Sequence, residues 1–410
     1  MSGRPHIPSI LIHTDALAHG KVKAQLFRPH LVKRLSRRRV DSTRAPYRKE
    51  TMTSQPRFHS SASASASASS PSLLFVDGDA KTWTNETPLT PRNLVASEPC
   101  AGGTYTVGIA RRRESESIFE LDGLDFHVER LCNDAAVAHN FGHSTRVTES
   151  LAERREALEE AVRTNLDCAL ASASTSTSEP WRRAREATVT LTVRPTGDGS
   201  DLSVAALAQP RAAESSEQRK RRVGVYVNVS TRRRGRCPPA RSPAHVKYTA
   251  WALERKELEL ELARWNERRP DEACDEFVMT ALDTSNSSDD APSFVLLEGL
   301  TSNFCARFRN ESTGEIELRR AAPGDRVLDG FEARRFAQRE RRAGVSVVDI
   351  APTLDDITGR SRPSPWTLDG CFITNALKGT VPVDFIVIAP DEDADDARVV
   401  RLRDVPTTPG

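Results

Sequence analysis

Three charged side chains stand where they could do chemistry. Lys247 lies between a short strand-like pair and an expected helix over 251–268, a rigid place from which to aim one ε-amino group. Glu298 follows an apolar run and precedes Gly299, which indicates a carboxylate at the buried start of a loop. Arg130 lies on an expected helix, and its planar guanidinium suits a dianionic phosphate. Taken singly, each also has an ordinary interpretation as a surface charge or an exposed strand end.

The composition excludes several other classes of protein. The chain has 410 residues, 38% of them hydrophobic and 28% charged, which predicts two or three domains with well-developed cores. No apolar run approaches the ~18 residues of a membrane span, so we expect no membrane partner. Residues 1–75 carry 13 basic and 3 acidic side chains, whereas the rest carries 46 basic and 54 acidic. The body is therefore acidic, and we expect no nucleic-acid partner.

The number and spacing of the cysteines argue against a disulfide framework and a metal site. There are seven, an odd number, and no two share a C-x-x-C spacing. A disulfide framework or a zinc site would need paired spacings. We expect reduced thiols packed as small hydrophobic groups and no metal site.

Residues 1–70 have the composition of a targeting sequence, and we do not expect them to form part of the folded domains. They are rich in Arg, Ser and Ala, contain KRLSRRR at 33–39 and end in SASASASASS. This composition is typical of an organellar transit peptide, for a mitochondrion or chloroplast. The alternative is a disordered extension with Met52 as the true start, which would leave the protein in the cytoplasm.

The remainder reads as two domains of mixed α/β class. We expect an N-terminal α/β domain over 71–235, a Pro-rich connection over 236–244, a larger β-rich domain with helices over 245–395, and a tail over 396–410. The first domain is expected to hold strands at 104–110, 117–124, 187–195 and 223–230, helices at 126–138 and 149–166, a loop at 171–180 and a polar segment between its last two strands. The second is expected to hold helices at 251–268 and 331–344 and strands at 275–282, 293–299, 303–309, 315–320, 345–351 and 381–389.

Five segments, in one order, resemble the fold type IV (class IV) pyridoxal-phosphate enzymes. That group comprises branched-chain aminotransferases, D-amino-acid aminotransferases and aminodeoxychorismate lyases. The segments are FHVERL (126–131), HVKYTAW (245–251), LLEGLTSNF (296–304), RVLDGFEARRF (326–336) and CFITNALKGTVPV (371–383). The resemblance implies the two-domain fold type IV architecture, pyridoxal 5′-phosphate (PLP) as the cofactor and a homodimer.

The resemblance also implies roles for the three charged residues. Lys247 would hold the PLP aldehyde as a Schiff base and shuttle a proton, with Lys256 and Lys378 as poorer candidates. Glu298 would keep the pyridine nitrogen protonated, and Arg130 would bind the phosphate. Ser302 and Asn303 would lie on the loop after Glu298, Asn303 supporting the site by hydrogen bonds.

The phosphate-binding segments depart from the family pattern. Many relatives have Gly-Ile-Thr-Arg at a helix N-terminus, whereas this chain has Gly330, Phe331, Glu332 and Ala333. The amides survive but the hydroxyl does not, and we expect the Glu332 carboxylate to point away from the phosphate because like charges repel. Relatives likewise carry Ser or Thr hydroxyls where this chain has Asn375 and Ala376, and Thr374 and Asn375 would supply a donor.

The resemblance leaves the reaction open. The leading hypothesis is an aminotransferase that moves an amino group between an amino acid and a 2-oxo acid by a ping-pong mechanism. The alternatives are a lyase that releases pyruvate from 4-amino-4-deoxychorismate and a non-catalytic descendant of the fold. One arginine of the basic run before Lys247 would clamp a substrate carboxylate, the candidates being Arg232, Arg233, Arg234 and Arg236.

Overall fold

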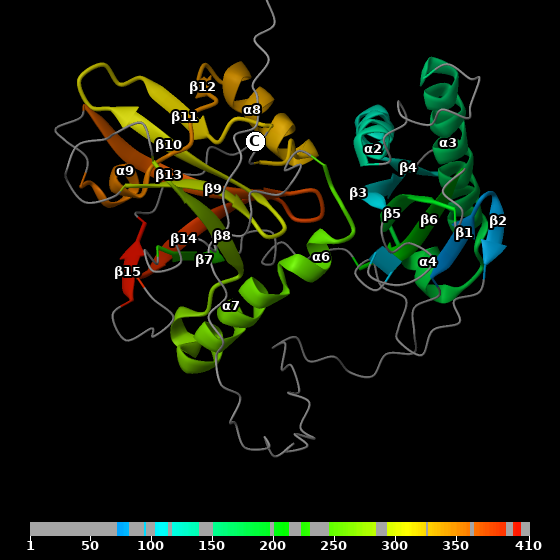
Figure 1. Ribbon diagram of the computed structural model, residues 1–410, viewed down its shortest axis with the longest axis horizontal. Coiled ribbons are helices and arrows are strands. Elements are labelled where there is room, and N and C mark those ends of the chain that lie inside the picture. Colours follow the sequence, from blue (N-terminus) through cyan, green and yellow to red (C-terminus); the bar gives the residue numbers. More distant parts are fainter. Residues whose placement is uncertain are drawn as a thin grey trace, which may run out of the picture. The chain divides into compact units, whose positions relative to one another are not determined.

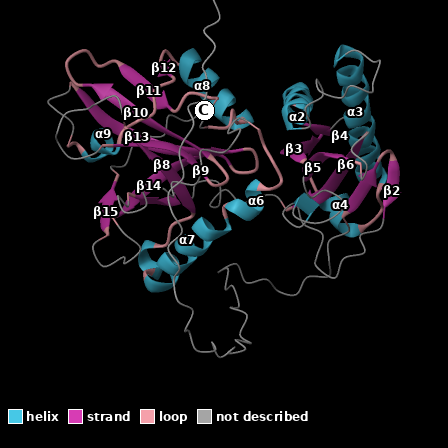
Figure 2. Ribbon diagram, in the orientation of Figure 1, coloured by secondary structure: helices cyan, strands magenta, loops and turns pink. Residues whose placement is uncertain are grey.

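The computed structural model places two β-sheets in the chain, each with its own helices (Figures 1 and 2). The structure describes residues 72–81, 94–95, 103–113, 117–138, 151–196, 201–212, 223–229, 246–283, 293–324, 327–360, 365–390 and 397–402. The expected leader over 1–70 and the connection over 236–244 lie outside these ranges. All the described residues belong to one compact unit, 65–410.

The first sheet has six strands and is grouped with the described helices α2, α3 and α4; we call this part the small lobe. Its strand order is β2-β1-β6-β5-β3-β4. The strands are β1 (Leu73–Val76), β2 (Asp79–Lys81), β3 (Thr104–Arg112), β4 (Phe119–Leu121), β5 (Glu186–Pro195) and β6 (Leu202–Arg211). The helices are α2 (Leu124–Ala138), α3 (Leu151–Thr175) and α4 (Glu179–Arg183).

The helix α3 packs on this sheet through one apolar stripe. Leu158, Val162 and Leu166 are buried in the core that α2 and α3 share with strands β3, β5 and β6. Their spacing of four residues is that of one helix face, and each contributes roughly 1.5–3 kcal/mol by leaving water. The small lobe therefore has a core of its own.

The second sheet, which with its helices we call the large lobe, closes on itself. Its order is β12-β11-β10-β13-β14-β7-β8-β9, with β9 pairing back to β10 and β15 pairing with β14. The strands are β7 (Val223–Asn228), β8 (Glu276–Leu282), β9 (Phe294–Gly299), β10 (Asn303–Asn310), β11 (Ile316–Arg320), β12 (Ser346–Val348), β13 (Trp366–Asn375), β14 (Gly379–Ala389) and β15 (Arg398–Arg401). The helices are α6 (Trp251–Glu254), α7 (Lys256–Arg268), the 3₁₀ turn Pro270–Glu272, α8 (Phe331–Arg342) and α9 (Leu354–Thr358).

The expected mixed α/β class, with a smaller α/β part and a larger β-rich part, is confirmed. One strand was assigned to the wrong part. The strand expected at 223–230 is β7, which pairs in parallel with β14 and β8 in the large lobe. Five of its six residues are buried, as expected for a strand inside a sheet covered on both faces.

Three further expectations about elements were wrong. The loop expected at 171–180 is helical to Thr175, because Ala169 and Ala173 continue the buried stripe of α3 and Ser174 bonds back to the Leu170 carbonyl. The polar segment before β7 contains strand β6, the buried partner of β1 and β5. The tail contains strand β15.

Two expectations about absences concern only the described residues. None of the described helices is long and apolar enough to cross a bilayer. In the same ranges no group of His, Cys, Asp and Glu side chains could hold a metal ion. Five described cysteines are free, and four of these are buried, as expected for thiols packed as small hydrophobic groups.

Candidate active site

One cavity of about 230 Å³ lies between residues of the small and large lobes. All ten residues that the sequence analysis singled out for cofactor binding or catalysis line it: Arg130, Lys247, Glu298, Ser302, Asn303, Gly330, Phe331, Glu332, Thr374 and Asn375. They come from five separate segments of the chain. Chemistry-bearing residues far apart in the sequence are therefore gathered around one space.

Lys247 is held by backbone bonds to strand β3. Its carbonyl accepts from the Tyr105 amide at 3.0 Å, and two residues later the Thr249 amide donates to the Gly103 carbonyl at 2.9 Å. Its own amide donates to the Asp134 carboxylate at 3.1 Å. The Lys247 ammonium lies 4.7 Å from the centre of the Tyr105 ring. The residue is thus fixed by the small lobe while it leads into helix α6 of the large lobe.

Glu298 lies where the closed sheet is completed. It is the penultimate residue of β9 and pairs with Asn303, the first residue of β10. Its side chain is buried. Its Oε2 atom accepts from the backbone amide of Leu328 at 3.0 Å and lies 3.5 Å from the side-chain Nδ2 of Asn303. Asn303 also donates to the Leu328 carbonyl at 2.7 Å. Asn303 thus links the Glu298 carboxylate to the Leu328 segment, and its support of a bound cofactor stays a prediction.

A second buried carboxylate, which the sequence analysis missed, holds the turn after Glu298. Glu276 accepts from the Leu300 amide at 3.0 Å, from the Thr301 hydroxyl at 2.7 Å and from the Ser302 hydroxyl at 2.9 Å. Burial raises its pKa, while these hydrogen bonds act in the opposite direction. Ser302 therefore faces Glu276 as well as lining the cavity.

Arg130 is a half-buried guanidinium on α2. Its nitrogens lie 3.5 Å from the Asp329 carbonyl and from the Thr106 hydroxyl, and its Nε lies 3.8 Å from Asp134. Thr106 is in turn 2.7 Å from Nδ1 of His127. The same carboxylate, Asp134, thus contacts Arg130 and the Lys247 backbone.

His127 is a neutral member of this wall. It is 1% exposed, and burial, together with the charges of Arg130 and Lys247, lowers its pKa from 6.5 to about 3. Among the described residues its Nε2 atom has no hydrogen-bond partner. The ring packs 5.1 Å from that of Phe331. His127 therefore contributes a buried, neutral ring to the packing of this wall.

The first turn of α8 forms another part of the wall. Gly330 precedes the helix, and a Cβ atom there would meet Oδ1 of Asn303, so a larger residue would have to displace the Asn303 side chain. The first amides of the helix point beyond its N-terminus, where an anion is stabilised. The position is thus compatible with a phosphate.

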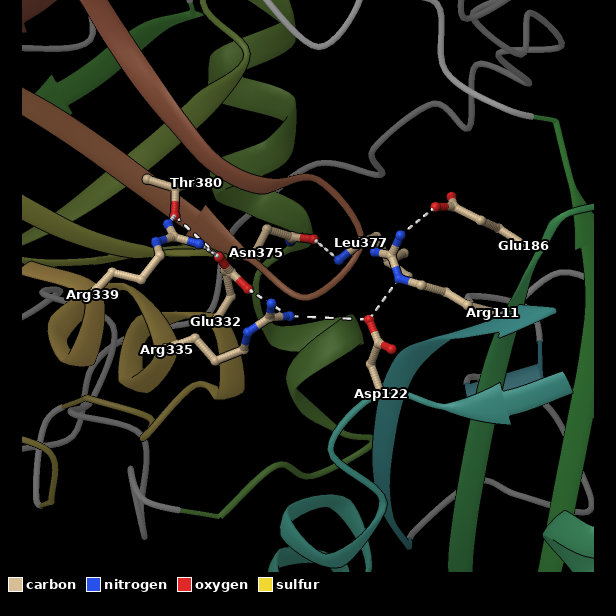
Figure 3. Close-up of polar contacts among 9 residues, drawn as sticks. All are labelled: Arg111, Asp122, Glu186, Glu332, Arg335, Arg339, Asn375, Leu377 and Thr380. Carbon is tan, nitrogen blue, oxygen red and sulfur yellow. Dashed lines mark hydrogen bonds and ion pairs between the residues drawn. The ribbon is translucent and has the colours of Figure 1, made fainter. Parts of the chain in front are cut away.

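Glu332 in that turn is paired with arginines (Figure 3). Its carboxylate lies 3.4 Å from Arg339 and 3.7 Å from Arg335, and accepts from the Thr380 hydroxyl at 3.1 Å. Arg335 reaches on to Asp122 of the small lobe at 4.0 Å, which itself accepts from Arg111 at 2.8 Å. Because Glu332 also lines the cavity, its turning away from a phosphate stays a prediction.

Thr374 and Asn375 end strand β13 at the cavity. Asn375 donates to the Thr301 carbonyl at 2.6 Å and accepts from the Leu377 amide at 2.8 Å, which shapes the hairpin turn to β14. The Thr374 hydroxyl is buried and has no hydrogen-bond partner within the described ranges. It is therefore free to donate to a bound molecule.

These groups fit PLP. The unpartnered Thr374 hydroxyl, the Arg130 guanidinium and the α8 amides offer donors for a phosphate, while Lys247 and the buried Glu298 supply an amine and a carboxylate. Tyr105 and Arg255 are among the cavity residues that the sequence analysis missed. The arginines at 232–236 lie outside the described residues.

Comparison with known proteins gives structural matches only. No family model matches the chain, and no curated protein matches it. Among solved structures, a hypothetical aminotransferase from Mycobacterium tuberculosis is 14% identical, with 77% of this chain and 91% of that one covered and a TM-score of 0.48. The fold IV transaminase CpuTA1 from Curtobacterium pusillum is 12% identical, covering 77% and 90%, with a TM-score of 0.47.

The branched-chain amino acid aminotransferase of Escherichia coli is 16% identical, with 77% of this chain and 86% of that one covered and a TM-score of 0.46. All three of these solved structures carry aminotransferase names.

Proposed function

We propose that this protein is a PLP-dependent aminotransferase that moves an amino group between an amino acid and a 2-oxo acid in a ping-pong cycle. One observation supports it above the others: Lys247 and Glu298, from distant segments, line the same cavity together with Arg130 and the start of α8. Bound PLP would supply an aldehyde that takes up the amino group and a ring that accepts electrons from the substrate carbon.

The residues of the chain would divide the remaining work. Lys247 Nζ would anchor the cofactor and then carry a proton from the substrate Cα and return it. Glu298 would hold a proton on the ring nitrogen, because a buried carboxylate is stable only beside a positive partner or enough hydrogen bonds. Arg130, the α8 amides and Thr374 would bind the phosphate. The neutral His127 would orient the aromatic wall without exchanging protons.

The first test is the covalent attachment of PLP. Protein reconstituted with PLP should be yellow, and borohydride reduction should trap the label on Lys247, located by peptide mass spectrometry. Lys247→Ala should lose both the label and turnover, whereas Lys256→Ala, an exposed lysine at the start of α7, should keep both. A colourless wild-type chain that takes up no PLP would contradict the proposal and favour the non-catalytic descendant.

A second assay separates transfer from elimination. The loaded protein is incubated with a panel of D- and L-amino acids and a 2-oxo acid, and separately with aminodeoxychorismate. An aminotransferase forms the new amino acid and 2-oxo acid in equal amounts. Pyruvate released from aminodeoxychorismate, with no transfer in the panel, would instead identify a lyase.

A further inference from the structure

Arg255 is a cavity residue that the proposed function leaves without a task. It stands between helices α6 and α7 and lines the cavity beside Ala252 and Leu300. Its side chain is only 12% exposed, so the guanidinium faces the cavity wall rather than bulk solvent. Arginine is rarely buried this far unless its charge is used.

The guanidinium is held in one orientation. Its NH1 donates to the Leu300 carbonyl at 3.2 Å, and the Trp251 indole donates to the same carbonyl at 3.1 Å. Its Nε lies 2.9 Å from a carboxylate oxygen of Glu259. Leu300 is fixed in turn through its amide, which donates to Glu276. The planar, fork-shaped guanidinium of Arg255 is thus positioned before any ligand binds, which lowers the entropic cost of binding.

One terminal nitrogen is still available. Within the described part of the chain the contacts of Arg255 are made through NH1, Nε and the backbone, and none through NH2. A planar guanidinium with one open donor edge suits a planar carboxylate. Ala252 lines the cavity one helical turn earlier and presents only a methyl group, so it leaves room beside the fork.

The other charges of the cavity have partners or tasks of their own. Arg130 comes from α2 and would bind the phosphate, and Lys247 would hold the aldehyde. The carboxylate of Glu332 is paired with Arg335 and Arg339. Arg255 is the cationic group of the described lining that remains for the substrate.

We propose that Arg255 binds the carboxylate of the substrate, so that the protein acts on amino acids in preference to amines. This rests on the proposed function, since it concerns the substrate of the same cavity. Arg255 lies in the described cavity wall, whereas the basic run at 232–236 lies outside the described residues and stays an untested prediction.

The experiment uses the PLP-loaded full chain and three variants. Arg255→Met removes the charge, Arg255→Lys keeps it without the fork, and Arg264→Met is a matched control at an exposed arginine of α7. The probes are D- and L-leucine against 3-methylbutylamine, which lacks only the carboxylate, and the amino-free acid 4-methylpentanoate, whose binding is measured by calorimetry.

We expect Arg255→Met to weaken 4-methylpentanoate binding by about 10- to 100-fold, the value of a hydrogen bond to a charged group. The preference for leucine over the amine should fall by a similar factor, mainly through KM. Arg255→Lys should lose part of both, and Arg264→Met neither. The thermal unfolding midpoint reports whether each variant is folded.

Three results would overturn the role of Arg255. The preference and the acid affinity could both be unchanged in Arg255→Met. The PLP affinity, titrated by absorbance, could fall as much as the acid affinity, which would place the guanidinium on an oxygen of the cofactor. The Lys variant could match the Met variant in a folded protein. Failure of the wild type to take up PLP would instead contradict the proposed function itself.

Discussion

Two parts of the cavity wall each contain a buried glutamate, and the two are held in opposite ways. In the first, which we call the inner wall (Glu298, Asn303 and Leu328), the carboxylate accepts hydrogen bonds from neutral donors. In the second, the α8 edge (Glu332, Arg335 and Arg339), the carboxylate is paired with two half-exposed arginines. Both glutamates are less than 7% exposed, so burial alone does not explain the difference.

The two carboxylates differ in the charge of the groups that contact them. The Leu328 amide and the Asn303 side chain, which donate to Glu298, are neutral, and a protonated pyridine ring would be a cationic partner. Glu332 carries its own counter-charges, so a bound anion nearby would meet a neutralised group. The inner wall and the α8 edge are therefore both compatible with the proposed binding of PLP.

The largest effect should follow removal of the inner-wall charge. In Glu298→Gln we expect PLP to attach to Lys247 while kcat falls by roughly 100-fold, because a buried ion pair with the ring is lost and about 1.4 kcal/mol is worth a factor of ten. Turnover of the best amino acid, with borohydride trapping as the control for loading, is the measurement. Unchanged turnover would remove Glu298 from its assigned role.

The next effect is a pH dependence of stability carried by His127. Its pKa in the folded protein is about 3 and its ordinary value is 6.5, so between these limits the unfolded chain binds the extra proton. Stability therefore falls as the pH drops through this window. Between pH 7 and 4.5 the wild type should lose about 2 kcal/mol more than His127→Gln, measured by urea unfolding at each pH.

Other groups titrate in both proteins, so the test is the difference between the wild type and His127→Gln in the free energy of unfolding at each pH. Parallel curves would show that His127 is protonated in the folded state at pH 4.5. Turnover of the wild type between pH 6 and 8 should show no step assignable to His127, because it is already neutral there.

The sequence predicted those site residues that lie close together in the chain, but not those that long-range strand pairing brings to the cavity. Glu298, Gly299, Ser302 and Asn303 lie in or beside the short turn that joins β9 to β10, so a local motif captured their proximity. Tyr105 was missed because its place in the cavity depends on the pairing of β3 with the Lys247 segment, a contact over more than 140 residues of chain. No local pattern reports such a pairing.

Arg255 did leave a signal in the sequence. Trp251, Leu258 and Trp265 recur on one helix face and are all buried, and Arg255 falls on the same stripe, four residues after Trp251. A charge on an apolar stripe is a candidate for function. The expected continuous helix over 251–268 concealed it, because the structure divides that helix into α6 and α7 at this residue.

The boundary between the lobes was misjudged for a different reason. The apolar pattern of the strand at 223–228 would suit either sheet, and its partners β14 and β8 lie far along the chain. Composition therefore predicted the element but not the sheet that contains it.

A smaller effect separates the α8 edge from the inner wall. Glu332→Gln should leave PLP affinity unchanged or improved, because a negative charge beside the phosphate position is removed. The apoprotein should lose only about 1 kcal/mol, since Arg335 and Arg339 are half exposed and solvent screens them. Absorbance titration with PLP and thermal unfolding of the apoprotein give the two values. A marked loss of PLP affinity would mean that Glu332 belongs functionally with Glu298.

The smallest effect concerns the link between the α8 edge and the small lobe. Asp122 accepts from Arg111 at 2.8 Å and lies 4.0 Å from Arg335, and these three side chains are 29%, 52% and 47% exposed (Figure 3). Exposed pairs of this kind contribute below about 1 kcal/mol and weaken with salt. Asp122→Asn should therefore lower the thermal midpoint by only a few degrees in 20 mM NaCl, and the gap to the wild type should close in 1 M NaCl. A gap that persists in high salt would show that Asp122 acts through packing or hydrogen bonding, and the α8 edge would then depend on the small lobe as firmly as Lys247 does.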